Sequence, residues 1–127
     1  SPNYADSVLI INPLTNTTDT TALSVVRTPA ELWHGIAFAP TTGRLYCAPL
    51  SASSVLIIDP STNTTDTSTL AGFRTDVEKW FGITFSPTTG LLYCAPFRAD
   101  GVLIINPLTN TTDTSALAGF GTSSYKW

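Results

Sequence analysis

Several residue types are scarce or missing in this chain of 127 residues. Only 12% of the residues are charged, and 6 Lys and Arg stand against 9 Asp and Glu. Since no basic cluster is present, the composition argues against nucleic acid as a partner. The longest apolar runs are as short as residues 8–11, far below the roughly 20 residues of a membrane-spanning helix, so no membrane insertion is expected. Methionine and a signal peptide are absent, which indicates a mature product or an excised piece.

Motifs for catalysis are equally scarce. The sequence contains 1 His and 2 Cys, and it has no nucleophile elbow, phosphate-binding loop, dinucleotide fingerprint or calcium loop. A Ser-His-Asp arrangement stays open, because several serines and aspartates are present. The pattern nevertheless predicts no catalytic residue, no metal and no cofactor, and we expect a protein that is not an enzyme.

Internal repeats dominate what is there. Residues 8–13 (VLIINP) recur as 55–60 (VLIIDP) and again as 102–107 (VLIINP), each time 47 positions later. Residues 35–43 recur as 82–90 with the same spacing. A fixed period of this length is typical of solenoids and propellers. We therefore expect a single repeat domain over the whole chain, made of a partial repeat and two longer ones: 1–33, 34–80 and 81–127.

Each full repeat is predicted to contain four antiparallel strands, A to D. Alternating apolar residues around a Pro-Thr-Thr-Gly turn indicate the A–B hairpin, and a β-branched run followed by a Pro-containing turn indicates the C–D hairpin. Such four-stranded units are propeller blades. The expected fold is all-β, built from four-stranded antiparallel propeller-like blades in an incomplete ring, without long helices. Strands are expected near 8–12, 17–23, 35–40, 45–49, 55–59, 64–70, 82–87, 92–96, 102–106 and 111–117.

Two segments carry a resemblance to a known family. Residues 82–93 (GITFSPTTGLLY) and 55–64 (VLIIDPSTNT) resemble the YVTN-type β-propeller repeat, which pairs a G-V-A-V-S-P-D-G-x-x-x-Y block with a V-x-V-I-D-x-x-T-N-T block. In this chain Y-C-A-P, at 46–49 and 93–96, stands in place of Y-V-T-N. The resemblance implies a propeller of the kind common in cell-surface and surface-layer proteins.

The repeat boundaries indicate an unbalanced set of hairpins. The order of predicted strands is C-D, then A-B-C-D twice, which falls short of the about four blades that a closed propeller needs. The first C strand therefore has an unpaired edge, and an exposed apolar edge recruits another chain. We expect an assembly edge formed by Val8, Leu9, Ile10 and Ile11, and an open assembly such as a polymer is consistent with the imbalance.

Three N-x-T acceptors follow the C–D turns. Asn16, Asn63 and Asn110 occupy equivalent positions, and their side chains are expected to be exposed and N-glycosylated in a eukaryotic secretory source. The alternative is a Thr-rich hairpin with a turn asparagine. Glycans along this edge would force assembly contacts onto other surfaces.

Other repeated positions have a structural and a functional interpretation. Cys47 and Cys94 are predicted to be buried free thiols, because equivalent strands of neighbouring blades lie too far apart for a disulfide. His34 has Phe81 as its equivalent, which favours packing over catalysis. The aspartates of strand D are expected to accept hydrogen bonds from loop amides, with calcium binding as the alternative; these are Asp19, Asp66 and Asp113.

Aromatic residues gather before each strand A. Trp33, Trp80 and Trp127 recur at one position, and the D–A and B–C connections around them share one face of a blade. The rings either pack between blades or form a sugar-binding face with one subsite per repeat. The candidate ligand or interface residues in these segments also include Phe73, Phe120, Tyr125 and Arg74, with Lys79 and Arg98 nearby.

These patterns together favour a non-catalytic structural module. We expect an extracellular or cell-surface protein that associates with copies of itself or with neighbouring repeats as a homo-oligomer or polymer. The alternative is a multivalent carbohydrate-binding lectin, for which glycans would be the partners. An enzyme is the third class.

Overall fold

The computed structural model describes residues 2–25, 32–123 and 126. Within these ranges the chain is built from ten strands and contains no helix, so the described part has no helix that could cross a membrane. The strands are β1 (Ile10–Asn12), β2 (Thr17–Asp19), β3 (Trp33–Ala39), β4 (Arg44–Pro49), β5 (Leu56–Asp59), β6 (Thr64–Asp66), β7 (Trp80–Ser86), β8 (Leu91–Pro96), β9 (Leu103–Asn106) and β10 (Thr111–Asp113).

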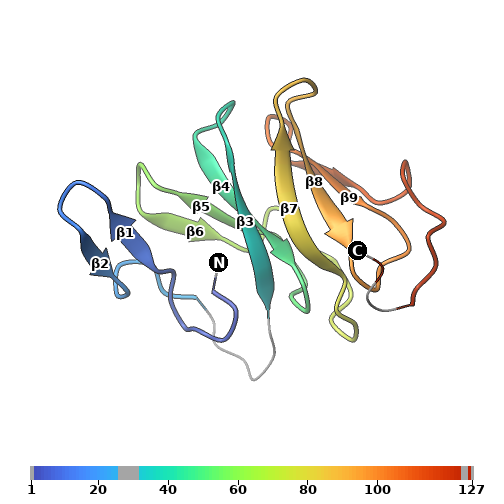
Figure 1. Cartoon of the computed structure of the whole chain (residues 1–127), viewed down its shortest axis with the longest axis horizontal. Helices are drawn as coiled ribbons and strands as arrows, with labels where there is room; N and C mark the ends of the chain where they lie inside the picture. Colours follow the sequence, from blue (N-terminus) through green and yellow to red (C-terminus); the bar gives the residue numbers. More distant parts are fainter. Residues whose placement is uncertain (1, 26–31, 124–125, 127) are drawn as a thin grey trace.

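The strands form one hairpin and two four-stranded antiparallel sheets. The sheet orders are β1-β2, β3-β4-β5-β6 and β7-β8-β9-β10, so each sheet follows the chain from strand to neighbouring strand. Figure 1 shows the three units side by side, with β3 and β7 adjacent where the two sheets meet. The sheets do not close on one another. The expected all-β fold of propeller-like blades in an incomplete arrangement is confirmed.

The two complete blades share their strand registers. Tyr46 pairs with Ile57 in the first sheet, and Tyr93 pairs with Ile104 in the second. Both A strands also carry an irregularity directly after the tryptophan, at 34–37 in β3 and at 80–83 in β7. Because pairing continues through this bulge, strand A begins at the tryptophan itself, two residues earlier than predicted.

The D strands are shorter than predicted. The expected strand over 64–70 ends at Asp66, because the Asp66 carboxylate accepts the backbone N–H groups of Ser68 and Thr69 and turns the chain out of the sheet. Pairing resumes at the bridge between Ser54 and Ala71. The equivalent aspartates, Asp19 and Asp113, end the other two D strands in the same way. The strand predicted at 17–23 is therefore observed at 17–19, and the strand predicted at 111–117 is observed at 111–113.

Alternate side chains of the first sheet face opposite neighbours. Tyr46 and Ile57 pack toward the second sheet, whereas Cys47, Leu56 and Ile58 pack toward the β1–β2 hairpin. The central run 55–58 is buried on both faces, as the sequence predicts. The core therefore consists of two layers, one between each pair of consecutive units.

Candidate functional site

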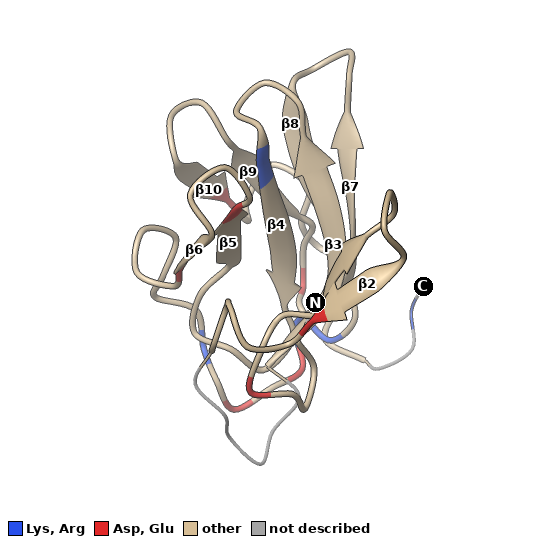
Figure 2. Ribbon diagram, turned by 90° about the vertical axis from the view of Figure 1, so that its left-hand side faces the viewer, with Lys and Arg blue, Asp and Glu red and all other residues tan. Residues whose placement is uncertain are grey.

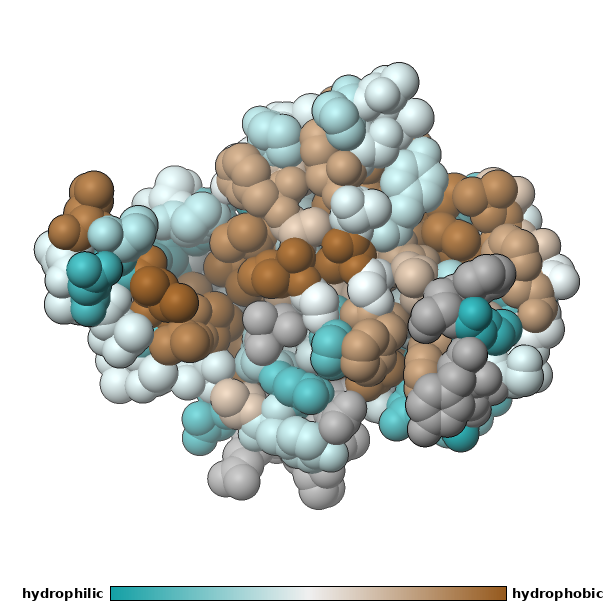
Figure 3. Space-filling model, in the orientation of Figure 1, coloured by the Kyte–Doolittle hydropathy of each residue, from teal (hydrophilic) through white to brown (hydrophobic). Residues whose placement is uncertain are grey.

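The β1–β2 end of the molecule exposes apolar side chains that are buried elsewhere. Leu9 is 57% exposed and Ile11 62% exposed. Their equivalents in the first sheet, Leu56 and Ile58, are 0% and 2% exposed. The two segments are nearly identical in sequence, so the difference in exposure arises from the missing neighbour. We call Leu9 and Ile11 the leading face; Figure 3 shows hydrophobic side chains at this end of the molecule.

The other half of the predicted assembly edge lies inside the protein. Val8 is 7% exposed and packs in the layer against the first sheet, with Ile10 partly buried beside it. The assembly edge at 8–11 stays a prediction, but these two side chains face the first sheet because successive residues of a strand point to opposite faces. The two outward-facing residues remain candidates for association.

Strand β1 also has an edge without a paired strand in the described chain. It pairs with β2 alone, whereas β5 pairs with β6 on one side and with β4 on the other. In that complete sheet Leu56 lies opposite Cys47 and Ile58 opposite Leu45. The same register applied to β1 would place a strand of the β4 type opposite Leu9 and Ile11.

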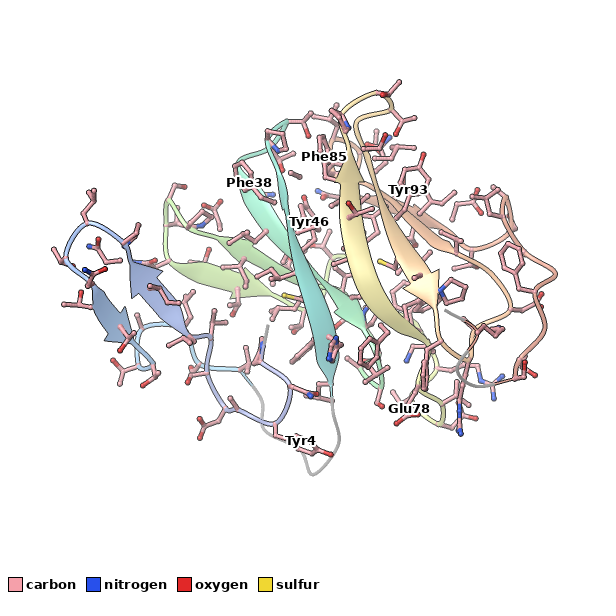
Figure 4. All side chains as sticks on the ribbon, viewed as in Figure 1. Tyr4, Phe38, Tyr46, Glu78, Phe85 and Tyr93 are labelled. Atoms are coloured by element: carbon pink, nitrogen blue, oxygen red, sulfur yellow. The ribbon has the colours of Figure 1, made fainter. Side chains whose placement is uncertain are left out.

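The second sheet carries the opposite end face. Tyr46 and Ala48 are fully buried where the second sheet covers them, but their equivalents Tyr93 and Ala95 are partly buried and exposed, respectively. Figure 4 shows Tyr46 between the two sheets and Tyr93 on the second sheet. We call Tyr93, Ala95 and the partly buried Ile104 the trailing face. These residues are equivalent to Tyr46, Ala48 and Ile57, which form the surface of the first sheet that the second sheet covers.

A cleft recurs once per blade where the D–A and B–C connections meet. The first cleft has a volume of about 650 Å³ and the second about 560 Å³. Both volumes fall in the range of small-molecule sites, about 300–1,000 Å³. Equivalent residues line them: Trp33 and Trp80, Ser51 and Arg98, Ser53 and Asp100, Thr67 and Thr114, and Thr75 and Thr122.

The two described tryptophans form the packed floor of these clefts. Trp33 and Trp80 are each 4% exposed. The indole N–H of Trp33 donates to the carbonyl of Ser54 at 2.7 Å, and that of Trp80 donates to the carbonyl of Gly101 at 2.9 Å. Their burial agrees with packing between blades, the first of the two interpretations.

The remaining aromatic candidates differ in placement. Phe73 packs edge-on against Trp80 with ring centroids 5.3 Å apart, and Phe120 is 42% exposed. Tyr125 and Trp127 lie outside the described residues.

Charged residues concentrate around the second cleft, and Figure 2 shows blue and red ribbon segments together in the loops at the lower end of the view. Arg74 donates to Asp76, with the closest approach 2.6 Å, and Arg98 lies 3.9 Å from Glu78. Lys79 is only 3% exposed, and its ammonium donates to the carbonyl of Leu50 at 2.9 Å. Burial lowers the pKa of Lys79 to about 8.

Both thiols lie in the core and are free. Cys47 and Cys94 are 0% exposed and unpaired with each other, as predicted. Burial raises the pKa of Cys47 to about 12 and raises the pKa of Cys94 further, with Cys47 adding to the second shift. No group of three or more metal-ligating side chains occurs among the described residues.

The three sequon asparagines share one backbone conformation. Asn16, Asn63 and Asn110 have φ values of 54°, 51° and 52°, and all three are exposed. Asparagine is one of the few residues with a side chain that adopts this left-handed conformation readily. The turn itself thus accounts for asparagine here, and exposure leaves the side-chain amide accessible to a modifying enzyme.

The strand D aspartates act as the sequence predicts. Asp19 accepts the N–H groups of Thr21 and Ala22, and Asp113 accepts those of Ser115 and Ala116. Backbone hydrogen bonds from Thr21 and from Ser115 are the main cause of a lowered pKa in Asp19 and Asp113, respectively. In both residues these amides donate to one carboxylate oxygen, Oδ1.

Sequence reasoning missed part of each cleft wall. The B–C connections at 51–54 and 98–101 contribute side chains and carbonyls, and Asp100 accepts the N–H groups of Gly119 and Gly121. The detectable signal was the divergence of the two repeats, since Leu32 and Ser51 stand where Lys79 and Arg98 stand one repeat later.

Comparison with known proteins supports the fold. No protein-family model and no curated protein matches the chain. Hydrazine synthase of Kuenenia stuttgartiensis is similar in structure, with a TM-score of 0.59 and 18% identity over 90% of this chain and 31% of that chain. An auxiliary nutrient binding protein of Bacteroides ovatus has a TM-score of 0.51 and 17% identity over 77% of this chain and 22% of its own. The chain thus spans less than a third of either protein, and at these identities the likeness concerns the fold alone.

Proposed function

We propose that the protein is a non-catalytic structural module of propeller-like repeats, which associates end to end with copies of itself or with neighbouring repeats. The observation that carries the proposal is the exposure of Leu9 and Ile11, at 57% and 62%, in a segment whose equivalents are buried. Burying apolar surface stabilises an interface by about 25 cal/mol per Å². Covering the leading face with another repeat therefore stabilises the assembly.

The partner surface is present on the same chain. Inside the molecule, side chains of the Leu103 and Ile105 type pack on side chains of the Tyr46 and Ile57 type. The leading face presents the first kind, and the trailing face presents the second through Tyr93 and Ile104. A head-to-tail contact between two copies would reproduce the packing between the two sheets. Such contacts between different surfaces generate closed rings or open filaments.

The unpaired edge of β1 offers a second site of association, through backbone hydrogen bonds. A strand of the β4 type, supplied by another repeat, would satisfy the free backbone groups of β1 in the register of the complete sheet. An extracellular or cell-surface location is part of the proposal. The exposed sequons and the resemblance to YVTN-type repeats support that location, and the family assignment stays a prediction.

Sedimentation of the purified chain over a range of concentrations tests the proposal. The wild-type protein should show mass that rises with concentration. Replacing Leu9→Glu together with Ile11→Lys should leave a folded monomer, because both side chains are exposed and contribute little to internal packing. Leu14→Glu is the matched control, since Leu14 is 93% exposed but lies in the β1–β2 turn. A wild-type chain that stays monomeric at every concentration would contradict the proposal.

Carbohydrate binding is the second candidate, and the recurrence of a cleft in both blades favours it. The first cleft is lined by Ser and Thr hydroxyl groups beside apolar side chains, a combination that suits a neutral sugar. Glycan-array binding that survives in the monomeric double variant would support this function separately from assembly.

A further inference from the structure

The two clefts share a backbone scaffold but differ in charge. The described residues that line the first cleft, which include Leu32 and Ser51, are all uncharged. The second cleft has Lys79 and Arg98 at those two positions, together with Arg74 and Asp100. Because the surrounding backbone fold is repeated, the difference in charge arises from the side chains that differ between the two repeats.

Cations are concentrated at the second cleft far beyond their frequency in the chain. The sequence contains 6 Lys and Arg, and 4 of them, Arg74, Lys79, Arg98 and Lys126, lie at this cleft. Lys126 belongs to the set because its ammonium donates to the carbonyl of Ala99, which lines the cleft, at 2.7 Å. These four cations lie beside three carboxylates, Asp76, Glu78 and Asp100, so the surroundings of the cleft carry a small excess of positive charge in a chain of net charge −3.

Among the described carboxylates, Asp76 attracts Lys79 electrostatically, but none forms a close ion pair with it. Asp76 pairs with Arg74, and Glu78 lies near Arg98. Asp100 receives two backbone N–H groups, from Gly119 and Gly121. Among the described residues no carboxylate forms an ion pair with Lys79, whose side chain is 3% exposed. A buried ammonium with one carbonyl acceptor is costly unless an anion approaches it.

We propose that the second cleft binds a small ligand that carries an oxyanion group, such as a carboxylate, sulfate or phosphate. The oxyanion binds to the exposed guanidinium groups of Arg98 and Arg74, where charge-assisted hydrogen bonds form, and the buried Lys79 adds positive charge behind them. The hydroxyl groups of Thr114, Thr122 and Ser123 line the same cleft and bind polar parts of the ligand. Among the residues that the structure describes, the first cleft is lined by no charged side chain, and we expect it to bind an anion more weakly.

The experiment is an NMR titration of the full chain with three probes: sulfate, D-glucuronate and D-glucose. We expect saturable shifts of amides lining the second cleft with both anions, much weaker shifts with glucose, and weaker anion binding as salt is added. The ratio of sulfate to glucuronate affinity then tells whether an inorganic oxyanion or a carboxylated sugar is the better model. Equal shifts in both clefts, or equal affinity for glucuronate and glucose, would overturn the proposal.

The repeats supply the variants. Lys79→Leu with Arg98→Ser installs the residues of the first cleft and should weaken anion binding about tenfold or more. Arg44→Gln is the control, because Arg44 pairs with Asp59 and is not part of the cleft lining. The reciprocal change, Leu32→Lys with Ser51→Arg, should give the first cleft anion binding. Unchanged affinity in the first variant, with folding intact by circular dichroism, would contradict the assignment.

Discussion

His34 and Phe81, which occupy the same position in consecutive repeats, stack on each other with ring centroids 3.5 Å apart and an interplanar angle of 22°. Both rings come from the beginning of a strand A, and these strands form the contact between the two sheets. The single histidine of the chain therefore packs against its own repeat equivalent. This contact joins the two blades and agrees with the expectation of a packing role for His34.

Gly35 is required by the same contact. Its φ is +65°, and a Cβ atom there would lie 3.0 Å from the carbonyl oxygen of Phe81. Gly35→Ala should lower the free energy of unfolding by about 2–4 kcal/mol, from backbone strain and overpacking. Gly82→Ala is the control, because nothing lies within 4 Å of the added atom. Urea titrations that show equal losses for the two variants would contradict this account.

Tyr46 and Tyr93 provide a second matched pair. The Tyr46 hydroxyl is buried with no hydrogen-bond partner among the described residues, whereas the Tyr93 hydroxyl donates to Thr89 at 3.2 Å. Tyr46→Phe should therefore leave stability unchanged or raise it by about 1 kcal/mol, because it removes an unsatisfied polar group. Tyr93→Phe should cost about 0.5 kcal/mol or less. Thermal unfolding measures both, and a marked loss for Tyr46→Phe would reveal a partner for that hydroxyl.

The thiols should be inert in the native protein. Burial raises the pKa of Cys47 to about 12, so the reactive thiolate is almost absent at pH 8. We expect no reaction of folded protein with a disulfide reagent at pH 8, and reaction of two thiols per chain after denaturation in guanidinium. Rapid labelling of the native state would mean that the layers open readily.

Acid should weaken the C–D hairpins. Burial acts to raise the pKa of Asp66, but hydrogen bonds from Thr69 and Ser68 outweigh it and hold the pKa well below 3.8. A carboxyl with a depressed folded pKa contributes stability above its unfolded pKa, about 3.9, and this contribution is lost as pH falls toward the folded value. The urea midpoint should therefore fall from about pH 5 downward. Asp66→Asn, which keeps an acceptor but does not titrate, should reduce that dependence.

Glycosylation can be tested without disturbing the turns. Thr18→Val removes the acceptor motif at Asn16 but leaves the left-handed asparagine in place. After expression in a eukaryotic secretory pathway, intact-mass spectrometry should show the loss of one glycan. Thermal unfolding should show an unchanged melting temperature. Direct replacement of Asn16 would confuse this result with backbone strain. Unmodified asparagines in the wild-type material would contradict the prediction.

The run Val-Leu-Ile-Ile shows how far sequence reasoning reaches. It predicts a strand C in all three repeats, because β-branched residues bounded by turns define a strand locally, although the first strand begins at Ile10 and not at Val8. Leu9 is nevertheless 57% exposed while Leu56 is 0% exposed. Burial depends on which neighbour covers the strand, and that neighbour is not encoded in the run itself.

The clefts and the D strands illustrate two other limits. The sequence predicted that Trp33 and the connections share one face, but it could not define walls built from backbone carbonyls and from residues 98–101. Threonine content predicted a strand D that continued to Leu70. The chain instead leaves the sheet after Asp66, because a side chain that captures nearby amides competes with the ladder.

The shortness of the D strands determines the direction in which an assembly of this protein grows. The outer strands β2, β6 and β10 are three residues long, too short to serve as templates for lateral strand addition. Apolar surface is offered instead at the two ends of the stack of blades. Growth should then lengthen a thread of constant width, and concentrated protein should yield such threads, not broad sheets that bind amyloid dyes.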